Sequence, residues 1–275
     1  RNIYTLLRMM QTNFVSTFSI LSTLERLKAS PKKFFTVSTD KASSPVNFMG
    51  LSKSLMEICA FKGWSFPVSS ARFANVAYSN GSLLDSFVNR LNLLQPISYP
   101  GDIKRYFINH LEAAHLCLVS ILRCQDRQFL IPNFQESEAL GFEQFATSLL
   151  ASKGYSPFYC DSETEAVRRL PELEKQSKWP IFVSRSDTSG EKVVESFLSS
   201  NDRVIEGLGD QLLVAHRADY GSGTEIDHLL GSLIELLNKA VLDKNKTPFL
   251  LSKDIQCLIP EFVYVDLQRS LDDKM

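Results

Sequence analysis

Four consecutive residues, Ser38 to Lys41, carry two hydroxyls, a carboxyl and an amine in a row. They overlap the end of an aromatic and β-branched run at 34–38, a composition typical of a buried parallel strand. Ligands of open α/β sheets bind at the carboxyl ends of the strands. Because a carboxyl and an amine can exchange protons with a bound ligand, these residues are candidates for acid and base chemistry.

A helix that should follow this site adds a second amine. Ser44 and Pro45 suit a helix start, since serine caps free amides and the fixed φ of proline fits the first turn. Met49 and Lys53 are four residues apart and therefore share one face of this helix. Methionine has no exchangeable proton, so a proton relay at this face must use another group.

Alternating strand and helix patterns predict an α/β fold with a parallel, Rossmann-like sheet. Apolar residues recur at helical spacing from Ile3 to Phe18, and Asn109 with Glu112 forms a predicted capping box. The predicted elements are an opening helix, strand 34–38, helix 44–61, strand 66–73, a helix from 83, helix 113–122, strand 129–131, helix 142–152, a solvated helical insertion at 161–178, strand 180–184 and helix 224–242.

Composition excludes several classes of partner. The 275 residues contain 30 Lys and Arg against 31 Asp and Glu, so the net charge of -1 favours neither nucleic acid nor an anionic membrane. No apolar run approaches the roughly 20 residues that span a bilayer. The five cysteines lack C-x-x-C spacing and the four histidines lack metal-ligand spacing. We therefore expect reduced thiols, a cytoplasmic protein and no metal site.

The glycine-rich turn of dinucleotide-binding folds is not found in this sequence. Only glycine lets the backbone approach a pyrophosphate closely, and neither Gly207-x-Gly209 nor Gly221-x-Gly223 has the third glycine. Both are expected to be loops. The chain opens at Arg1 directly in a helical pattern, so we expect an incomplete Rossmann-like part, either because the true N-terminus lies upstream or because the protein is a truncated relative.

Several motifs resemble one family in the same order along the chain. VSTDKASSPVNFMGLSK at 37–53, ARFANV at 71–76, IKRYF at 103–107, SDTSGEK at 186–192 and the C-terminal IPEFVYVDLQRSLDDKM carry the resemblance. They are similar to nucleotide-sugar 4,6-dehydratases of polysaccharide biosynthesis, of the UDP-N-acetylglucosamine 4,6-dehydratase type. Met49 matches the methionine-containing branch of these extended short-chain dehydrogenases.

The resemblance implies an NAD-dependent dehydration. Bound NAD, expected rather than NADP, would oxidise the sugar C4 hydroxyl and so acidify the C5 proton. Lys41 would then be the base at C5, and Asp40 would be the acid that helps the C6 hydroxyl to leave as water. Free lysine and aspartate have pKa values of about 10.4 and 3.9, so burial must shift both pKa values toward the neutral forms.

The resemblance also implies roles for neighbouring polar residues. The tyrosine of related dehydrogenases is replaced by Met49, so the C4 proton relay falls to Thr39, with Ser38 as substitute and cofactor contact. Lys53 would hydrogen-bond the nicotinamide ribose, and Asn13 would hold the lysine through water.

Substrate contacts follow from the same motifs. Asn75 and Arg105 match residues that contact the substrate diphosphate, to which an arginine can bind in a bidentate manner. Glu191 and Lys192 would close over the nucleotide. Ala74 replaces the glycine usual in the family, which adds a methyl group near the path of the substrate.

The expected organisation is the remaining part of an NAD-binding, catalytic Rossmann-like domain at 1–80, followed at 81–275 by a mixed substrate-binding region with a C-terminal helical extension. The substrate-binding portion of the fold is expected to be smaller than the Rossmann-like part and mostly helical. Residues 105–135 are expected to return to the first domain. The predicted partner is a UDP-amino-sugar, and the complete protein is expected to form homo-oligomers. Two alternatives remain open: a truncated, non-catalytic remnant that binds nucleotide sugars or a partner subunit, and a nucleotide-sugar 4-epimerase.

Overall fold

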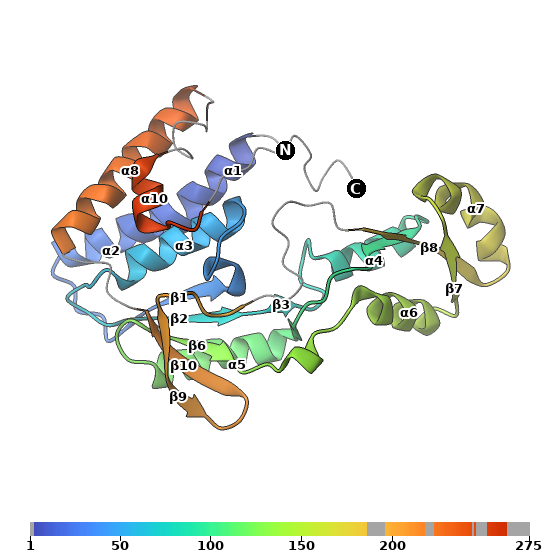
Figure 1. Ribbon diagram of the computed structural model, residues 1–275, viewed down its shortest axis with the longest axis horizontal. Coiled ribbons are helices and arrows are strands. Elements are labelled where there is room, and N and C mark those ends of the chain that lie inside the picture. Colours follow the sequence, from blue (N-terminus) through green and yellow to red (C-terminus); the bar gives the residue numbers. More distant parts are fainter. Residues whose placement is uncertain (1–2, 186–195, 218–222, 244, 246–251, 263–275) are drawn as a thin grey trace.

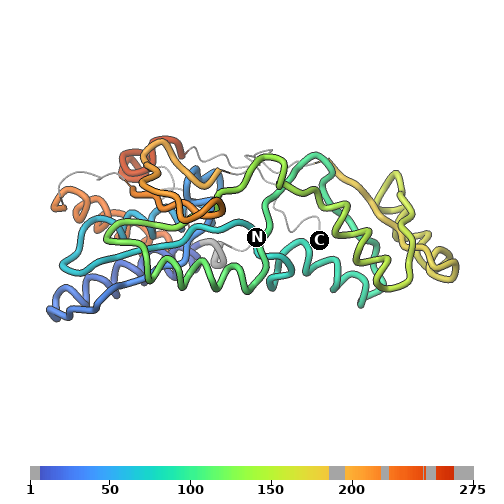
Figure 2. Tube along the Cα trace, turned by 90° about the horizontal axis from the view of Figure 1, so that it is seen from below, coloured from blue at the N-terminus to red at the C-terminus, as the bar shows by residue number. Residues whose placement is uncertain are grey.

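The computed structural model describes residues 3–185, 196–217, 223–243, 245 and 252–262. Figure 1 shows a larger portion, in which helices cover both faces of a sheet, joined to a smaller portion with its own sheet. The second view shows the two portions placed end to end in an elongated molecule (Figure 2).

The larger portion is built on a five-stranded sheet with strand order β1-β2-β6-β10-β9. Strands β1, β2 and β6 run parallel, whereas β10 is antiparallel to both β6 and β9. The bounds are β1 Phe34–Thr39, β2 Val68–Phe73, β6 Gln128–Pro132, β9 Asp202–Leu208 and β10 Leu212–Arg217. The parallel strands had been predicted, and the β9–β10 hairpin had not.

Helices on one face of this sheet form the largest apolar core. They are α1 Ile3–Met10, a π-helical turn Gln11–Val15, α2 Ser16–Arg26, α3 Phe48–Phe61, α8 Gly223–Asp243 and α10 Lys253–Leu258. Phe14, Leu55 and Leu233 are fully buried within that core. Helix α5, His110–Arg123, covers the opposite face of the sheet (Figure 1). Helix α8 contacts both α1 and α10, and buried residues of α3 belong to the same apolar cluster.

The smaller portion, which had been expected to be mostly helical, also holds a three-stranded parallel sheet in the order β4-β8-β7. Its elements are α4 Leu83–Asn92, β4 Ile97–Pro100, α6 Phe142–Ser152, β7 Ser156–Cys160, α7 Glu163–Lys175 and β8 Lys178–Ser184. Trp179, Ile181 and Phe87 are fully buried in its core. A two-stranded parallel pair, β3 Asn75–Val76 and β5 Phe107–Ile108, lies between the portions.

Local signals placed some boundaries correctly and others not. The Asn109 and Glu112 capping box is present at the start of α5. Helix α3 begins at Phe48 rather than at Ser44–Pro45, because the side chain of Asn47 caps it by accepting from the Gly50 N–H. The predicted solvated insertion is helix α7, whose Leu170 and Leu173 are buried.

The first Gly-x-Gly stretch was only partly a loop. Gly207 lies within β9, and Gly209 forms the turn to β10 with a φ of 66°, a conformation that favours glycine. Two further short helices, η2 Asp40–Ala42 and η3 Glu136–Glu138, complete the described elements.

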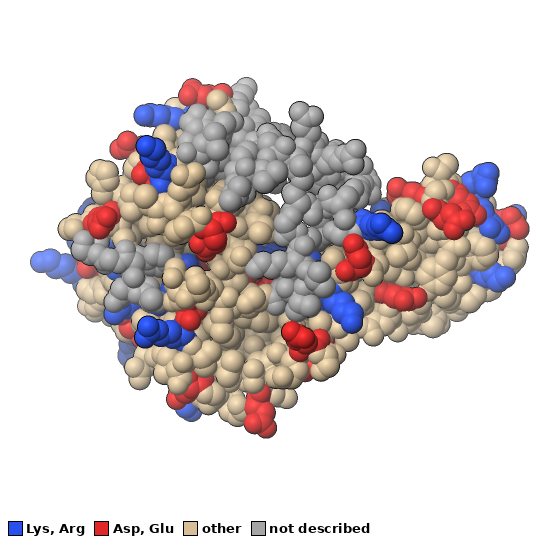
Figure 3. Space-filling model, viewed as in Figure 1, with Lys and Arg blue, Asp and Glu red and all other residues tan. Residues whose placement is uncertain are grey.

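The surface carries no dominant charge on the face drawn in Figure 3, where acidic and basic side chains are interspersed among other residues. Among the described residues, no helix combines the length and apolarity needed to cross a bilayer. Nor do those residues bring together three or more metal-binding side chains of the His, Cys, Asp and Glu types.

Candidate functional site

The predicted chemical residues lie where β1 ends and turns into the 3-10 helix η2. In the parallel register of β1 and β2, Thr39 pairs with Phe73, so the residues that follow each strand meet at the same edge of the sheet. Asp40 and Lys41 follow β1 in η2, and Asn75 follows β2. The Lys41 Nζ atom lies 3.5 Å from Asn75 Oδ1, so the fold brings these groups together.

Asp40 is the centre of the contacts in this turn. Its side chain is fully buried, and its Oδ1 atom accepts a hydrogen bond of 2.6 Å from the Thr39 hydroxyl. The same oxygen lies 3.3 Å from Lys41 Nζ, and the Lys41 side chain is 28% exposed. A hydroxyl, a carboxyl and an amine therefore form one continuous chain, with the amine nearest to solvent.

Close approach of helix α3 fixes the turn from the other side. A Cβ atom at Gly50 would lie 2.7 Å from the Lys41 carbonyl oxygen and 3.1 Å from Pro45 Cα, so a side chain there would push against backbone. The glycine of the motif thus lets the first turn of α3 contact the backbone of the predicted base.

Lys53 extends from α3 to the strand itself. Its Nζ donates a hydrogen bond of 3.0 Å to the Val37 carbonyl oxygen. Burial lowers the pKa of Lys53 below its ordinary value, and the negative charge of Glu57, one turn farther along α3, partly opposes this. Met49, one turn before Lys53, is 38% exposed.

Asn13 lies in the π-helical turn, which interrupts what the apolar pattern had predicted as a continuous helix. Its Nδ2 donates a hydrogen bond of 2.9 Å to the Ser52 hydroxyl, which in turn donates to the Met49 carbonyl. π-turns of this kind are frequent at functional sites. Asn13 thus contacts Ser52, the residue next to Lys53 on α3.

The remaining predicted site residues lie farther from the Asp40 turn or outside the described residues. Ser38 is buried, and its hydroxyl lies close enough to Glu57 to help lower the pKa of that carboxyl. Arg105 is buried as well, and its Nη1 donates to the Lys104 carbonyl at 2.8 Å. Glu191 and Lys192 lie outside the described residues.

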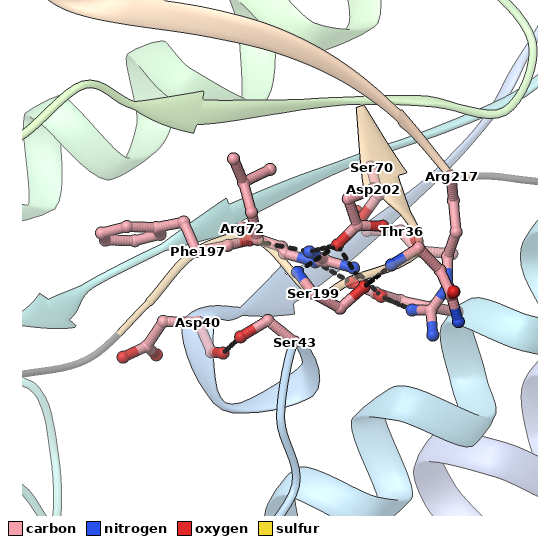
Figure 4. Close-up of polar contacts among 12 residues, drawn as sticks. Thr36, Asp40, Ser43, Ser70, Arg72, Phe197, Ser199, Asp202 and Arg217 are labelled. Carbon is pink, nitrogen blue, oxygen red and sulfur yellow. Dashed lines mark hydrogen bonds and ion pairs between the residues drawn. The ribbon is translucent and has the colours of Figure 1, made fainter. Parts of the chain in front are cut away.

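A second group of charged residues lies beside the turn and was not predicted. Figure 4 shows Arg72, Asp202 and Arg217 converging there; together with Glu57 they are called the charge cluster below. Arg72 donates two hydrogen bonds to Glu57, at 2.8 and 2.6 Å, and one of 2.6 Å to Asp202. Arg217 donates to the same Glu57 carboxyl at 2.6 Å. Their side chains are between 0 and 3% exposed.

Opposite charges keep both acids of the cluster ionised. Burial acts to raise the pKa of Glu57, but the positive charges of Arg72 and Arg217 outweigh it, and the pKa stays below its ordinary value. The pKa of Asp202 is also lowered, with burial again opposed mainly by Arg72. The guanidinium of Arg72 stacks 4.1 Å above the ring of Phe129, which adds a cation–π contact.

Sequence signals for the cluster were present but incomplete. Arg72 stands in a strand whose other residues are uncharged, and Glu57 is four residues after Lys53 on the same helix. A charge in a buried strand requires a partner. Asp202 and Arg217 could not be found in this way, because the strands that carry them had not been predicted.

The chain is similar in sequence to several known proteins. Residues 3–216 match the model of a family described as "Polysaccharide biosynthesis protein". An uncharacterized membrane protein of Methanocaldococcus jannaschii is 29% identical over 169 residues, covering 58% of this chain and 50% of that protein. The capsular polysaccharide biosynthesis protein CapD of Staphylococcus aureus is 24% identical over 217 residues, covering 77% of this chain and 32% of CapD.

A further relative is a UDP-glucose 4-epimerase of Rickettsia rickettsii, 37% identical over 86 residues, or 29% of this chain and 25% of the epimerase. The chain therefore spans half or less of the length of these relatives.

Among solved structures, Pen from Bacillus thuringiensis superposes with a TM-score of 0.54 at 18% identity, covering 82% of this chain and 69% of Pen. At this identity the match shows a shared Rossmann-like fold alone.

Proposed function

Because the chain belongs to the polysaccharide biosynthesis protein family, we propose that it carries the proton-transfer site of an NAD-dependent nucleotide-sugar dehydratase. The proposed substrate is a UDP-linked N-acetylhexosamine such as UDP-N-acetylglucosamine, and the product is its 4-keto-6-deoxy derivative. The observation that supports this most is the set of contacts that joins Thr39, Asp40, Lys41 and Asn75 at the end of β1.

The reaction needs a base and an acid side by side. Once C4 of the sugar is a ketone, the C5 proton is acidic enough for an amine to remove it, and the C6 hydroxyl must gain a proton to leave as water. Lys41 is assigned to the first transfer and Asp40 to the second. The 3.3 Å contact between Lys41 Nζ and Asp40 Oδ1 keeps the two groups close enough to act on adjacent carbons.

The pair can reach the required protonation states by moving one proton. A lysine that acts as base must be uncharged, and an aspartate that acts as acid must carry a proton. Asp40 gains its proton from the C4 hydroxyl through Thr39, and Lys41 enters the reaction as the uncharged amine, so the proton released at C4 is the one that leaves with the C6 hydroxyl as water.

The C4 hydroxyl proton is assigned to the Thr39 hydroxyl, which passes it to Asp40 along their 2.6 Å hydrogen bond. Ser38, which is buried and helps to lower the pKa of Glu57, is kept as the substitute for this relay. When bound, NAD would hold the hydride between its departure from C4 and its delivery to C6. Lys53, whose amine lies beside β1, would donate to the nicotinamide ribose.

The cofactor fits the described residues only at its nicotinamide end. The pKa of Lys53 is lowered but the amine still donates to the Val37 carbonyl, so it can exchange this acceptor for a ribose hydroxyl. The sequence holds no glycine-rich turn for the pyrophosphate, and no residue of the chain is assigned to that part of NAD.

Substrate binding is assigned to the polar residues around the turn. Asn75 is proposed to contact the diphosphate and also to orient Lys41, from which its Oδ1 lies 3.5 Å. Arg105 would bind the diphosphate through its guanidinium, and Glu191 with Lys192 would contact the nucleotide. Ala74, which replaces the family glycine, precedes Asn75 and is 6% exposed, so its methyl group packs inward.

A nucleotide-sugar 4-epimerase is the second candidate, favoured by the Rickettsia relative that shares 37% identity over 86 residues. An epimerase also oxidises C4 but removes no proton from C5 and releases no water. The Asp40 and Lys41 pair would then have no step to perform, which is why the dehydratase is preferred.

The product distinguishes these possibilities. The protein is incubated with NAD and UDP-N-acetylglucosamine, and the nucleotide sugars are analysed by mass spectrometry. The expected product is lighter than the substrate by one water, and turnover should fall about 100-fold or more in Lys41→Ala. The matched control is Lys239→Ala, which removes an exposed lysine of α8 and should turn over normally.

Two outcomes contradict the proposal. A product of unchanged mass with inverted C4 identifies an epimerase. Binding of the nucleotide sugar without any product, in protein that also binds NAD, identifies a non-catalytic binding protein.

A further inference from the structure

The chain segment 196–202 contacts the proposed catalytic turn at one end and the charge cluster at the other. Near its start, the Ser196 carbonyl oxygen lies 2.6 Å from the Ser43 hydroxyl, which also lies 2.7 Å from the Asp40 carbonyl oxygen. A hydroxyl has one proton, so Ser43 shares it between the two carbonyls. Ser43 is buried, and its N–H also donates to the Asp40 carbonyl at 3.1 Å.

The other end of this segment is held by Arg72. Its Nη1 donates both to the Phe197 carbonyl, at 2.7 Å, and to Asp202, at 2.6 Å. The same Asp202 oxygen accepts from the N–H and the hydroxyl of Ser199, each at 2.7 Å. Figure 4 shows these contacts with Arg72 between Phe197 and Asp202, and Asp40 with Ser43 on the neighbouring turn.

Arg72 also leads to the site along its own strand. Strand β2 ends at Phe73, and Asn75, which lies 3.5 Å from the Lys41 amine, follows two residues later. On the helix side, Arg72 binds Glu57, which is four residues after Lys53 on α3. One guanidinium is thus connected to the elements that carry Asn75 and Lys53 and to the segment that contacts the Asp40 turn.

We propose that the charge cluster and segment 196–202 act as a positioning clamp, which holds the Asp40 turn in place against α3 through Ser43. The inference rests on the proposed function, because the groups it positions are those assigned to proton transfer. Glu57, Arg72, Asp202 and Arg217 are positioning residues, since they reach the site only through other groups.

The clamp is rigid because its charges balance and have little access to water. Two acids and two arginines sum to zero charge, and three of the four side chains are completely buried. A shift of segment 196–202 would pull Asp202 from Arg72 and leave unpaired charge in the core, which is strongly unfavourable. Movement of the segment is therefore tied to movement of Ser43.

Coupling of this kind is reciprocal, and that reciprocity is the test. Amide hydrogen exchange is measured on the full chain for parent protein, Asp202→Asn and Ser43→Ala. Asp202→Asn keeps the shape of the side chain but removes its charge, and it should speed exchange at the Ser43 amide by about fivefold or more. Ser43→Ala removes the hydroxyl that contacts the Ser196 and Asp40 carbonyls, and it should speed exchange at the Asp202 amide, which donates to the Ser199 carbonyl.

A matched control separates coupling from general loss of stability. Asp254→Asn changes an aspartate that also accepts from a serine hydroxyl, that of Ser232 at 2.6 Å, in the contact between α8 and α10. It should leave exchange at Ser43 and Asp202 unchanged. If Asp202→Asn does not fold, Ser43→Ala alone decides. Faster exchange confined to the substituted element in the variants that fold would overturn the clamp.

Turnover measurements give a second test of the clamp, which is independent of the hydrogen-exchange test. In protein with the proposed dehydratase activity, Asp202→Asn should lower kcat more than it raises KM, because it displaces the proton-transfer turn. Asp202→Glu, which keeps the charge, should restore part of the lost kcat. Absence of any turnover would refute the proposed function but leave the exchange test intact. If Asp254→Asn changed kcat and amide exchange as much as Asp202→Asn does, the clamp would be contradicted.

Discussion

The catalytic turn and the charge cluster use the same types of residue for different purposes. In the charge cluster, arginines meet carboxylates at 2.6 to 2.8 Å and the side chains are at most 3% exposed. In the turn, the Lys41 amine lies 3.3 Å from Asp40 and 3.5 Å from Asn75, and its side chain is 28% exposed. Arginine stays charged at all relevant pH values, whereas lysine can lose its proton. The cluster is therefore suited to holding charge, and the turn to moving it.

The largest expected effect comes from breaking the cluster. Arg72→Met leaves Glu57 and Asp202 buried with only Arg217 to balance them, and we expect the free energy of unfolding to fall by about 3–5 kcal/mol. Lys41→Ala should cost at most about 1 kcal/mol, because its partly exposed amine lies 3.3 Å from Asp40, a weaker contact than those of the buried arginines. Denaturant unfolding of the two variants checks the contrast. Equal losses would show that the two groups do not differ in this way.

A smaller effect is expected where α3 approaches the turn. Gly50→Ala places a methyl group against the Lys41 carbonyl, and we expect a loss of about 1–3 kcal/mol in the free energy of unfolding. Gly231→Ala is the matched control, since a Cβ at this position of α8 meets nothing within 4 Å. It should stabilise the protein by up to about 1 kcal/mol through helix propensity. Thermal unfolding of both variants checks this contact. Changes of the same sign in the two melting temperatures would contradict it.

The smallest expected effect is the loss of folding stability at acidic pH. The folded-state pKa values of Glu57 and Asp202 are lowered, so their contribution to stability is complete above their ordinary pKa values of 4.5 and 3.8. It begins to be lost as the pH approaches these ordinary values and is gone once the pH has fallen through the lowered values. Between pH 6 and pH 4 we expect the two groups to account for a loss of about 1 kcal/mol. Arg72→Met should lose less over the same interval, and an equal pH dependence of parent and variant would argue against ionised acids in the cluster.

Sequence reasoning located the turn better than its surroundings. Two sequence motifs supply the residues of the turn, which are Thr39, Asp40, Lys41 and Asn75. Parallel pairing of β1 with β2 brings these residues together, as expected for two short strands that both end in polar residues. The roles of these residues are still proposals. Their neighbours depend on contacts between distant segments, which local patterns do not encode.

The β9–β10 hairpin illustrates what could not be predicted. Val204 and Ile205 are adjacent and about half exposed, at 46 and 52%, so this strand shows no alternation of buried and exposed residues. Without the hairpin, Asp202 and Arg217 had no place in the sheet, and Arg72 had no visible partner besides Glu57. The start of α3 was placed too early for a related reason, because Ser44 and Asn47 are both good caps and only the fold selects Asn47.

The most direct measurement of the central claim is the fate of the C5 proton. The protein is supplied with NAD and UDP-N-acetylglucosamine in deuterium oxide, and the sugar is examined by NMR and mass spectrometry. If Lys41 removes the C5 proton beside Asp40, the 4-keto-6-deoxy product will carry solvent deuterium at C5, and Lys41→Ala will form almost none of it. A product that retains its original C5 hydrogen, or undiminished deuterium incorporation by Lys41→Ala, would contradict the assignment.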